Sequence, residues 1–134
     1  MWEAYREVID KFHPISLEME RNLIHLAQRG SQTSRDELVL RHVGFVIFRL
    51  HKRVYSQYLR RYGEDLLSTA IPVLLNKVDT YDLNYCDKSG CRKSVRFASY
   101  IWKRIDGMII DSLKEFLRIE KAENFADLES LASL

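Results

Sequence analysis

Glycine and proline, the residues that form most tight turns, are scarce in this sequence. Among its 134 residues there are 5 glycines and 2 prolines. A fold of many short strands needs a turn every few residues, and glycine and proline are prominent in such turns. The scarcity therefore argues against a β-sandwich or a β-barrel and favours a few long helices.

Long apolar runs and secretion signals are also missing. There is no stretch of about 18 apolar residues, so the sequence predicts no transmembrane span. The first residues, Met1 to Ala4, lack the basic-then-apolar pattern of a signal peptide. We therefore expect a cytoplasmic protein with no membrane partner. In that compartment its two cysteines are expected to be free thiols.

Acidic residues are absent from two stretches of the chain. Residues 41–61 and 88–104 each contain six Arg or Lys and no Asp or Glu, whereas 62–87 and 105–134 are net acidic. The overall charge of +2 conceals this segregation. Basic segments set against acidic ones are typical of a protein with a polyanion-binding face. Solvated helix faces would give the same pattern and remain the alternative.

Apolar residues recur at helical spacing along most of the chain. Residues 83–93 read as a polar loop, and the acidic, weakly patterned 119–134 as a short helix or a tail. The predicted fold class is all-α, a compact bundle of five or six helices. The stripes predict helices at 2–13, 16–30, 34–58 and 64–81, and from 94 onward.

Local signals predict where these helices begin, end and bend. Gly30 stands where a helix C-terminus favours glycine. Ser34, with Glu37 three residues later, matches a capping box at the start of a helix. Gly63 marks a break before the next helix. Pro72 lies inside that helix, where proline costs about 3 kcal/mol unless the helix bends, so we expect a kink.

Four segments together resemble a known family. The run RFASYIWKRI at 96–105 resembles the promoter-melting segment in region 2 of bacterial sigma factors, and GMIIDSL at 107–113 is similar to the run that follows it in flagellar and stress-response sigmas. EDLL at 64–67 and LLNKVDTYD at 74–82 fit the family's polymerase-binding segment without gaps. RHVGFV at 41–46 resembles the opening of region 2, and the helix at 16–30 resembles the preceding region 1.2.

The resemblance implies a helical bundle of the sigma region 2 type. It divides the chain into N-terminal helices at 1–34, a region 2-like domain at 35–118 and an acidic linker or tail at 119–134. The matches stop before region 4, the helix-turn-helix that reads the upstream promoter element. Two alternatives follow: a fragment of a longer sigma factor, or a natural short sigma-like subunit.

By the same resemblance, Tyr100 stacks on the flipped adenine of the promoter minus-ten element, with Ser99 and Tyr81 shaping its pocket. Aromatic rings stack on unpaired bases, and basic side chains hold phosphates. The alternative for Phe97 and Trp102 is that both are core residues, and this interpretation is favoured for Phe97, which begins the buried stripe of its helix. The predicted DNA-binding residues are His42, Tyr81, Arg92, Lys93, Arg96, Ser99, Tyr100, Lys103 and Arg104.

Two positions beside this pocket depart from the housekeeping pattern. Lys103 and Arg104 stand where the family has two tryptophans, so the usual aromatic wedge at the edge of the melted DNA is missing there. Contact with duplex would depend more on charge. His42 stands where the family often places a polar residue near another extruded base; a partly buried histidine is the alternative.

The helix at 65–81 is expected to bind RNA polymerase. In the family this helix lies against a coiled coil of the largest catalytic subunit through an Asp, a Gln, a Glu and an Asn. Asp65 matches the first of these. Ser68, Thr69 and Ile71 stand at the other three positions, so the family contact is carried over only in part. Ordinary surface positions are the alternative.

We expect neither a metal site nor enzyme activity. A structural zinc site needs four ligands, usually in closely spaced pairs. Cys86 and Cys91 form one pair, but the four histidines lie outside that loop. No nucleophile elbow, phosphate-binding loop or dinucleotide fingerprint is present, and no cofactor is implied.

Two functions are compatible with these features. The first is a transcription initiation factor that binds core RNA polymerase and captures the non-template strand of promoter DNA. The alternative is a sigma-like interaction module that binds polymerase or a regulator without reading DNA. An anti-sigma factor or an activator would be a further partner in either case.

Overall fold

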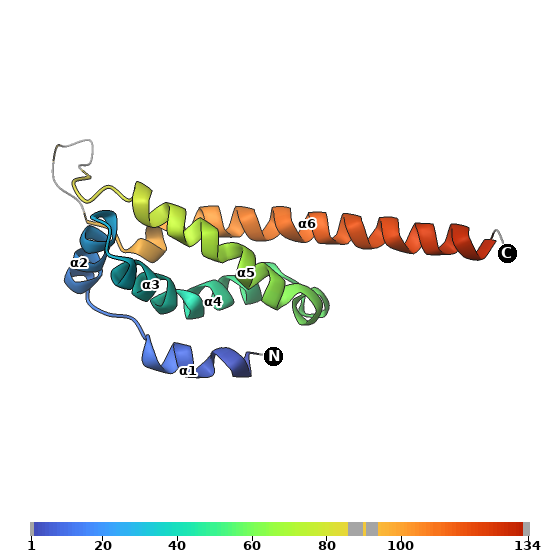
Figure 1. Ribbon diagram of the computed structural model, residues 1–134, viewed down its shortest axis with the longest axis horizontal. Coiled ribbons are helices and arrows are strands. Elements are labelled where there is room, and N and C mark those ends of the chain that lie inside the picture. The colour runs from blue at the N-terminus through green and yellow to red at the C-terminus, as the bar shows by residue number, and fades with distance from the viewer. Residues whose placement is uncertain (1, 86–89, 91–93, 133–134) are drawn as a thin grey trace.

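In the described part of the chain, the computed structural model contains six helices (Figure 1). It describes residues 2–85, 90 and 94–132, with the side chains described up to Ser130. The described residues contain helices and no strands, which confirms the all-α prediction. The helices are α1 (Glu3–Lys11), α2 (Leu17–Gln28), α3 (Gln32–Arg41), α4 (Val43–Arg53), α5 (Ser56–Thr80) and α6 (Phe97–Ala132).

One apolar core holds the bundle together. Helix α2 packs on α3, α5 packs on α6, and α4 packs on both α5 and α6. Phe97, at the start of α6, is fully buried, as the apolar stripe predicts. Helix α1 has no buried residue and lies along one side of the bundle, where Trp2 donates to His51 at 2.8 Å. Each helix within the described ranges is too short or too polar to cross a membrane.

The predicted helix at 34–58 begins at a different residue and is divided. Helix α3 is capped by Ser31, whose Oγ accepts from the Ser34 backbone N–H at 3.2 Å, so the predicted cap at Ser34 is wrong. Gly30, with φ +103°, follows α2 as predicted. The expected continuous helix at 34–58 is divided at His42 and again at Val54. The apolar stripe of this segment runs across both divisions, because each of its members is buried. They are Val39, Val43, Val46, Leu50 and Val54.

The predicted break at Gly63 is absent, and α5 continues through it. A Cβ at this position would lie 3.2 Å from the Trp2 ring, so the glycine makes room for α1 to pack. Pro72 also lies within α5, on its exposed side. Because proline has no N–H, it cannot donate to the carbonyl of Ser68, four residues earlier.

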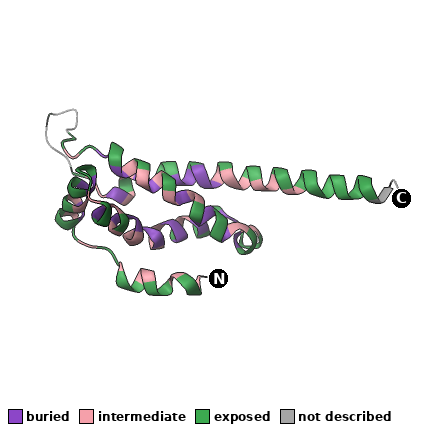
Figure 2. Cartoon of the chain, in the orientation of Figure 1, coloured by how far each residue is buried: buried purple, intermediate pink, exposed green. Residues whose placement is uncertain are grey.

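Helix α6 is longer than predicted and extends beyond the bundle (Figures 1 and 2). It continues to Ala132 through the segment expected to be a short helix or tail. Its last packed turns include Phe116, which stacks on Tyr62 at 5.4 Å, and Glu120, which accepts from the Tyr62 hydroxyl. Residues 121–130, which we call the outer segment of α6, are all exposed. Good helix formers (Glu, Lys, Ala and Leu) dominate this segment and maintain the helix without a buried face.

A buried carboxylate joins α2 to the start of α6. Glu20 is 4% exposed, and its Oε1 accepts from the backbone N–H of Phe97 at 2.5 Å. The first N–H groups of a helix have no acceptor within that helix. Glu20 therefore caps α6 from a neighbouring helix.

We predict that Glu20→Ala lowers the free energy of unfolding by about 1–3 kcal/mol, because it leaves a buried N–H without an acceptor. Glu20→Gln retains an acceptor oxygen and should lose less. Urea denaturation followed by circular dichroism measures both effects. Glu18→Ala, at an exposed position of the same helix, is the control and should change stability by less than about 0.5 kcal/mol. Equal losses in the Glu20→Ala and Glu18→Ala variants would contradict the capping role.

Candidate nucleic-acid interface

Tyr100 forms a cluster with the end of α5. Its hydroxyl lies 2.8 Å from Thr80 Oγ1, and its ring meets the Tyr81 ring edge-on with centroids 5.3 Å apart. The Lys77 ammonium lies 5.2 Å from the centre of the Tyr100 ring. Tyr81 is buried and donates to the Val95 carbonyl at 2.5 Å, while Tyr100 is half-buried. The fold thus brings together two of the residues predicted to form one pocket. We call Lys77, Thr80, Tyr81 and Tyr100 the Tyr100 cluster.

Exposed polar and basic side chains lie near this cluster on α6. Ser99, Lys103 and Arg104 are all exposed, within one turn of Tyr100. Positions three and four residues apart share a helix face, so Arg104 lies beside Tyr100 and Lys103 beside Ser99. A strand whose base reached Tyr100 would therefore pass cations that can hold its phosphates.

Arg96, predicted to hold a phosphate, makes two contacts within the protein. Its Nη2 donates to the Ile15 carbonyl at 2.7 Å and lies 3.6 Å from the Glu20 carboxylate. These contacts tie the α1–α2 connection to the start of α6. Arg92 and Lys93, the other predicted phosphate contacts near this end, lie outside the described residues.

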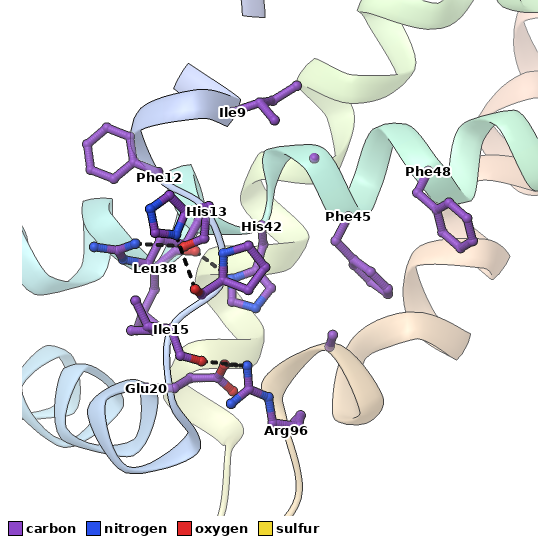
Figure 3. A pocket seen from close by; sticks show the side chains of 14 residues that line it. Ile9, Phe12, His13, Ile15, Glu20, Leu38, His42, Phe45, Phe48 and Arg96 are labelled. Carbon is purple, nitrogen blue, oxygen red and sulfur yellow. Dashed lines mark hydrogen bonds and ion pairs between the residues drawn. The ribbon is translucent and has the colours of Figure 1, made fainter. Parts of the chain in front are cut away.

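A cavity of about 400 Å³ lies beside Arg96 and Glu20, which both line it (Figure 3). Its polar wall includes Glu20, Arg41, His42 and Arg96, and Arg41 donates to the His13 carbonyl at 2.8 Å. The apolar wall includes Ile9, Phe12, Ile15, Leu38, Phe45 and Phe48. Sequence periodicity could not predict this cavity, because α1, α2, α3, α4, α6 and the α1–α2 connection all contribute to it.

His42 is buried in the cavity wall. Its Nδ1 lies 2.7 Å from the Leu38 carbonyl, and its ring meets the Phe97 ring edge-on at 4.9 Å. Burial lowers the pKa of His42, and the nearby Arg96 and Arg41 lower it further, while the Leu38 carbonyl and Glu20 oppose the shift. The neutral imidazole is therefore the favoured form in the folded protein. The position allows contact with a group that enters the cavity.

The predicted polymerase-binding residues divide between two environments. Asp65 and Ser68 are exposed on α5, and Thr69, at its edge, donates through Oγ1 to the Asp65 carbonyl at 2.8 Å. Ile71 is half-buried and packs against the core. A partner on this face would thus meet mainly Asp65 and Ser68, because Thr69 and Ile71 are both half-buried.

Neither sequence nor structural comparison identifies a relative. No protein-family model, no curated protein and no solved structure matches the chain. Among the residues that the structure describes, no three His, Cys, Asp or Glu side chains form a group that could hold a metal ion. Cys86 and Cys91 lie outside those residues.

The sequence did not predict Lys77 and Thr80 as site residues, nor the contact between Trp102 and Arg49. Lys77 and Thr80 complete the Tyr100 cluster; Lys77 lies four residues before Tyr81, a helical spacing that could have indicated it. Trp102, for which a core position was the alternative, is exposed, and the Arg49 guanidinium lies 5.2 Å from its ring centre. No sequence signal pairs residues so far apart in the chain.

We predict that stability falls as the pH drops below about 6.5, the ordinary histidine pKa in the unfolded chain. Because the folded-state pKa of His42 is lower, protonation favours the unfolded chain, and the stabilisation present above pH 6.5 is lost below it. Urea denaturation at pH 7.5, 6.5 and 5.5 measures the slope. His42→Gln should flatten it, whereas the exposed control His25→Gln should not. An equal slope in parent and His42→Gln proteins would refute this origin.

Proposed function

We propose that this chain is a sigma-like transcription initiation module that binds single-stranded promoter DNA through α6 and core RNA polymerase through α5. The observation that carries the proposal is the Tyr100 cluster, which presents a half-buried ring beside exposed cations. The resemblance of 96–105 to the promoter-melting segment assigns the ring its ligand, an unpaired base of the non-template strand.

The physical chemistry of base capture fits this cluster. Extruding a base from a duplex costs a few kcal/mol. Stacking on an aromatic ring contributes about 1–3 kcal/mol per base, and phosphate contacts add a salt-dependent term. Tyr100 is oriented by Thr80 and Tyr81, so little freedom of its ring is lost on binding. Lys77, Lys103 and Arg104 supply positive charge around it.

The polymerase contact of the proposal uses the exposed face of α5. Asp65, Ser68 and Thr69 lie at positions that match the family's docking helix. The partner implied by the resemblance is the coiled coil of the largest catalytic subunit. Ser68 and Thr69 are shorter than the Gln and Glu that they replace, so the proposed interface is smaller than the family's.

An interaction module that does not read DNA is the second candidate. The outer segment of α6 favours this function, because Phe125 and Leu128 there are 63% and 65% exposed. Large apolar side chains on an unpacked helix are typical of protein-binding surfaces. Such a surface would suit an anti-sigma factor or an activator.

For base capture, we predict that Tyr100→Ala weakens binding of a fluorescent minus-ten non-template oligonucleotide by about 1–3 kcal/mol, roughly five- to hundredfold. Tyr100→Phe should retain most of the affinity, because stacking needs the ring more than the hydroxyl. Fluorescence anisotropy with and without core polymerase measures both effects, after circular dichroism shows that each variant is folded. Tyr55→Ala, at a 78% exposed position, is the control. Unchanged binding by folded Tyr100→Ala would favour the interaction module.

For the polymerase contact, we predict that Asp65→Arg and Ser68→Arg each abolish co-purification with bacterial core RNA polymerase. Both side chains are exposed, so the helical fold should persist. Gln57→Arg places the same charge on an exposed position nearer the start of α5 and should retain binding. If all three variants co-purify equally, the docking surface lies elsewhere.

A further inference from the structure

A second set of basic and aromatic side chains lies where α6 faces α4. A shallow groove of about 380 Å³ is formed there. Tyr100 contacts α5 instead, through Thr80 and Lys77, so it lies at the opposite edge of α6. We call this site the α4–α6 groove; its lining includes Arg49, Arg53, Trp102, Lys103, Asp106 and Gly107.

A single carboxylate organises the cations of this groove. Arg49 donates through Nε to Asp106 Oδ1 at 2.8 Å and through Nη2 to Oδ2. The Nε of Arg53 lies 3.6 Å from the same carboxylate, and the Arg53 side chain is 48% exposed. Asp106 thus neutralises one arginine and leaves the second partly open to solvent. With Lys103 and the lining residue Asp111 included, three cations face two carboxylates, and the groove carries a net positive charge.

Trp102 presents an aromatic surface close to two of these cations. It is 38% exposed, although indole is among the largest apolar side chains. The Arg49 guanidinium lies 5.2 Å from its ring centre and the Lys103 ammonium 5.6 Å. Cations near an aromatic ring attract it electrostatically and help to hold it at the surface. The ring is therefore oriented without being enclosed.

Gly107 gives the groove a bare stretch of backbone. Glycine is among the least favourable residues within a helix, yet Gly107 lies inside the 36-residue α6. A Cβ added there would have no atom within 4 Å, and the position is exposed. Among the described residues, no contact explains the glycine. Glycine in an unstrained position allows close approach of another molecule to the backbone.

We propose that the α4–α6 groove binds the sugar–phosphate backbone of a nucleic-acid strand, with one base stacked on Trp102. Arg53 and Lys103 contact phosphates, and Gly107 lets the strand approach α6 closely. The proposal rests on the proposed function and adds a second contact to it. A strand held at the Tyr100 cluster passes Lys103, which lies on the exposed face of α6 between the two rings.

An acidic peptide is less well matched to this groove than a nucleic-acid strand. Carboxylates would satisfy Arg53 and Lys103, but an acidic peptide has no planar group for the exposed face of Trp102. A base provides that group, and a phosphate follows at each nucleotide. The groove also lies on the same helix as the Tyr100 cluster, so one extended ligand can contact both.

The glycine provides a test in which stability and binding change in opposite directions. Gly107→Ala should raise the melting temperature by a few degrees, because alanine favours the helix. It should weaken binding of a fluorescent 12-nucleotide single strand by about threefold or more, because the methyl group blocks close approach. Lys114→Ala, at an exposed position further along α6, controls for loss of distant charge. A stabilised Gly107→Ala protein with unchanged affinity would overturn the proposal.

Trp102 can be observed directly, because Trp2 is the one other tryptophan in the sequence. In a Trp2→Phe background, the same oligonucleotide should quench the remaining fluorescence on binding. Trp102→Ala should weaken binding about fivefold or more. Arg53→Gln should lower the slope of log affinity against log salt by about one, and the exposed control Arg60→Gln should not. Equal quenching by polyglutamate would overturn the assignment to nucleic acid.

The two sites can fail separately. If Tyr100→Ala weakens binding while the Gly107, Trp102 and Arg53 variants bind normally, the groove proposal is wrong and base capture at Tyr100 stands. If the groove variants bind weakly and folded Tyr100→Ala binds normally, the groove stands and base capture fails. Normal binding by every variant would refute both.

Discussion

The buried carboxylate of Glu20 determines how α2 meets the start of α6. It caps α6 by accepting from the Phe97 N–H, and it lies 3.6 Å from Arg96. The same helix, α2, also reaches the connection between α5 and α6: Gln28 donates to the carbonyls of Val78 and Tyr81, at 2.9 and 2.7 Å. The relative position of Tyr81 and Tyr100, and hence the candidate site, depends on these polar contacts from α2.

Most of the fold could be predicted from the sequence because apolar periodicity reports burial directly. Its divisions could not be, because a stripe that stays buried on both sides of a bend does not reveal the bend at His42. Gly63 looked like a break, yet its role is to accommodate Trp2, a contact between residues far apart in the chain. The outer segment of α6 has weak apolar periodicity because it has no buried face. The apolar pattern alone therefore underestimated the length of this helix.

In the candidate site, too, some features could be predicted from the sequence and others could not. Tyr81 and Tyr100 were predicted by a motif, and the structure brings them into contact. Arg96 was predicted from its charge alone, which does not reveal that its guanidinium contacts the Ile15 carbonyl. The cavity around His42 and the α4–α6 groove depend on side chains from several helices. Their chemistry becomes visible only when the helices are packed.

The projection of α6 has a mechanical consequence. At about 1.5 Å per residue, its 36 residues span about 54 Å, roughly twice the diameter of a small domain. The packed turns up to Glu120 supply the helix nucleus, which is the costly step of helix formation. The outer segment of α6 therefore adds turns by propagation alone. The outer segment of α6 therefore stays helical only while the bundle that nucleates it is folded. While it is helical, this segment holds anything bound near Leu128 at a set distance from the Tyr100 cluster.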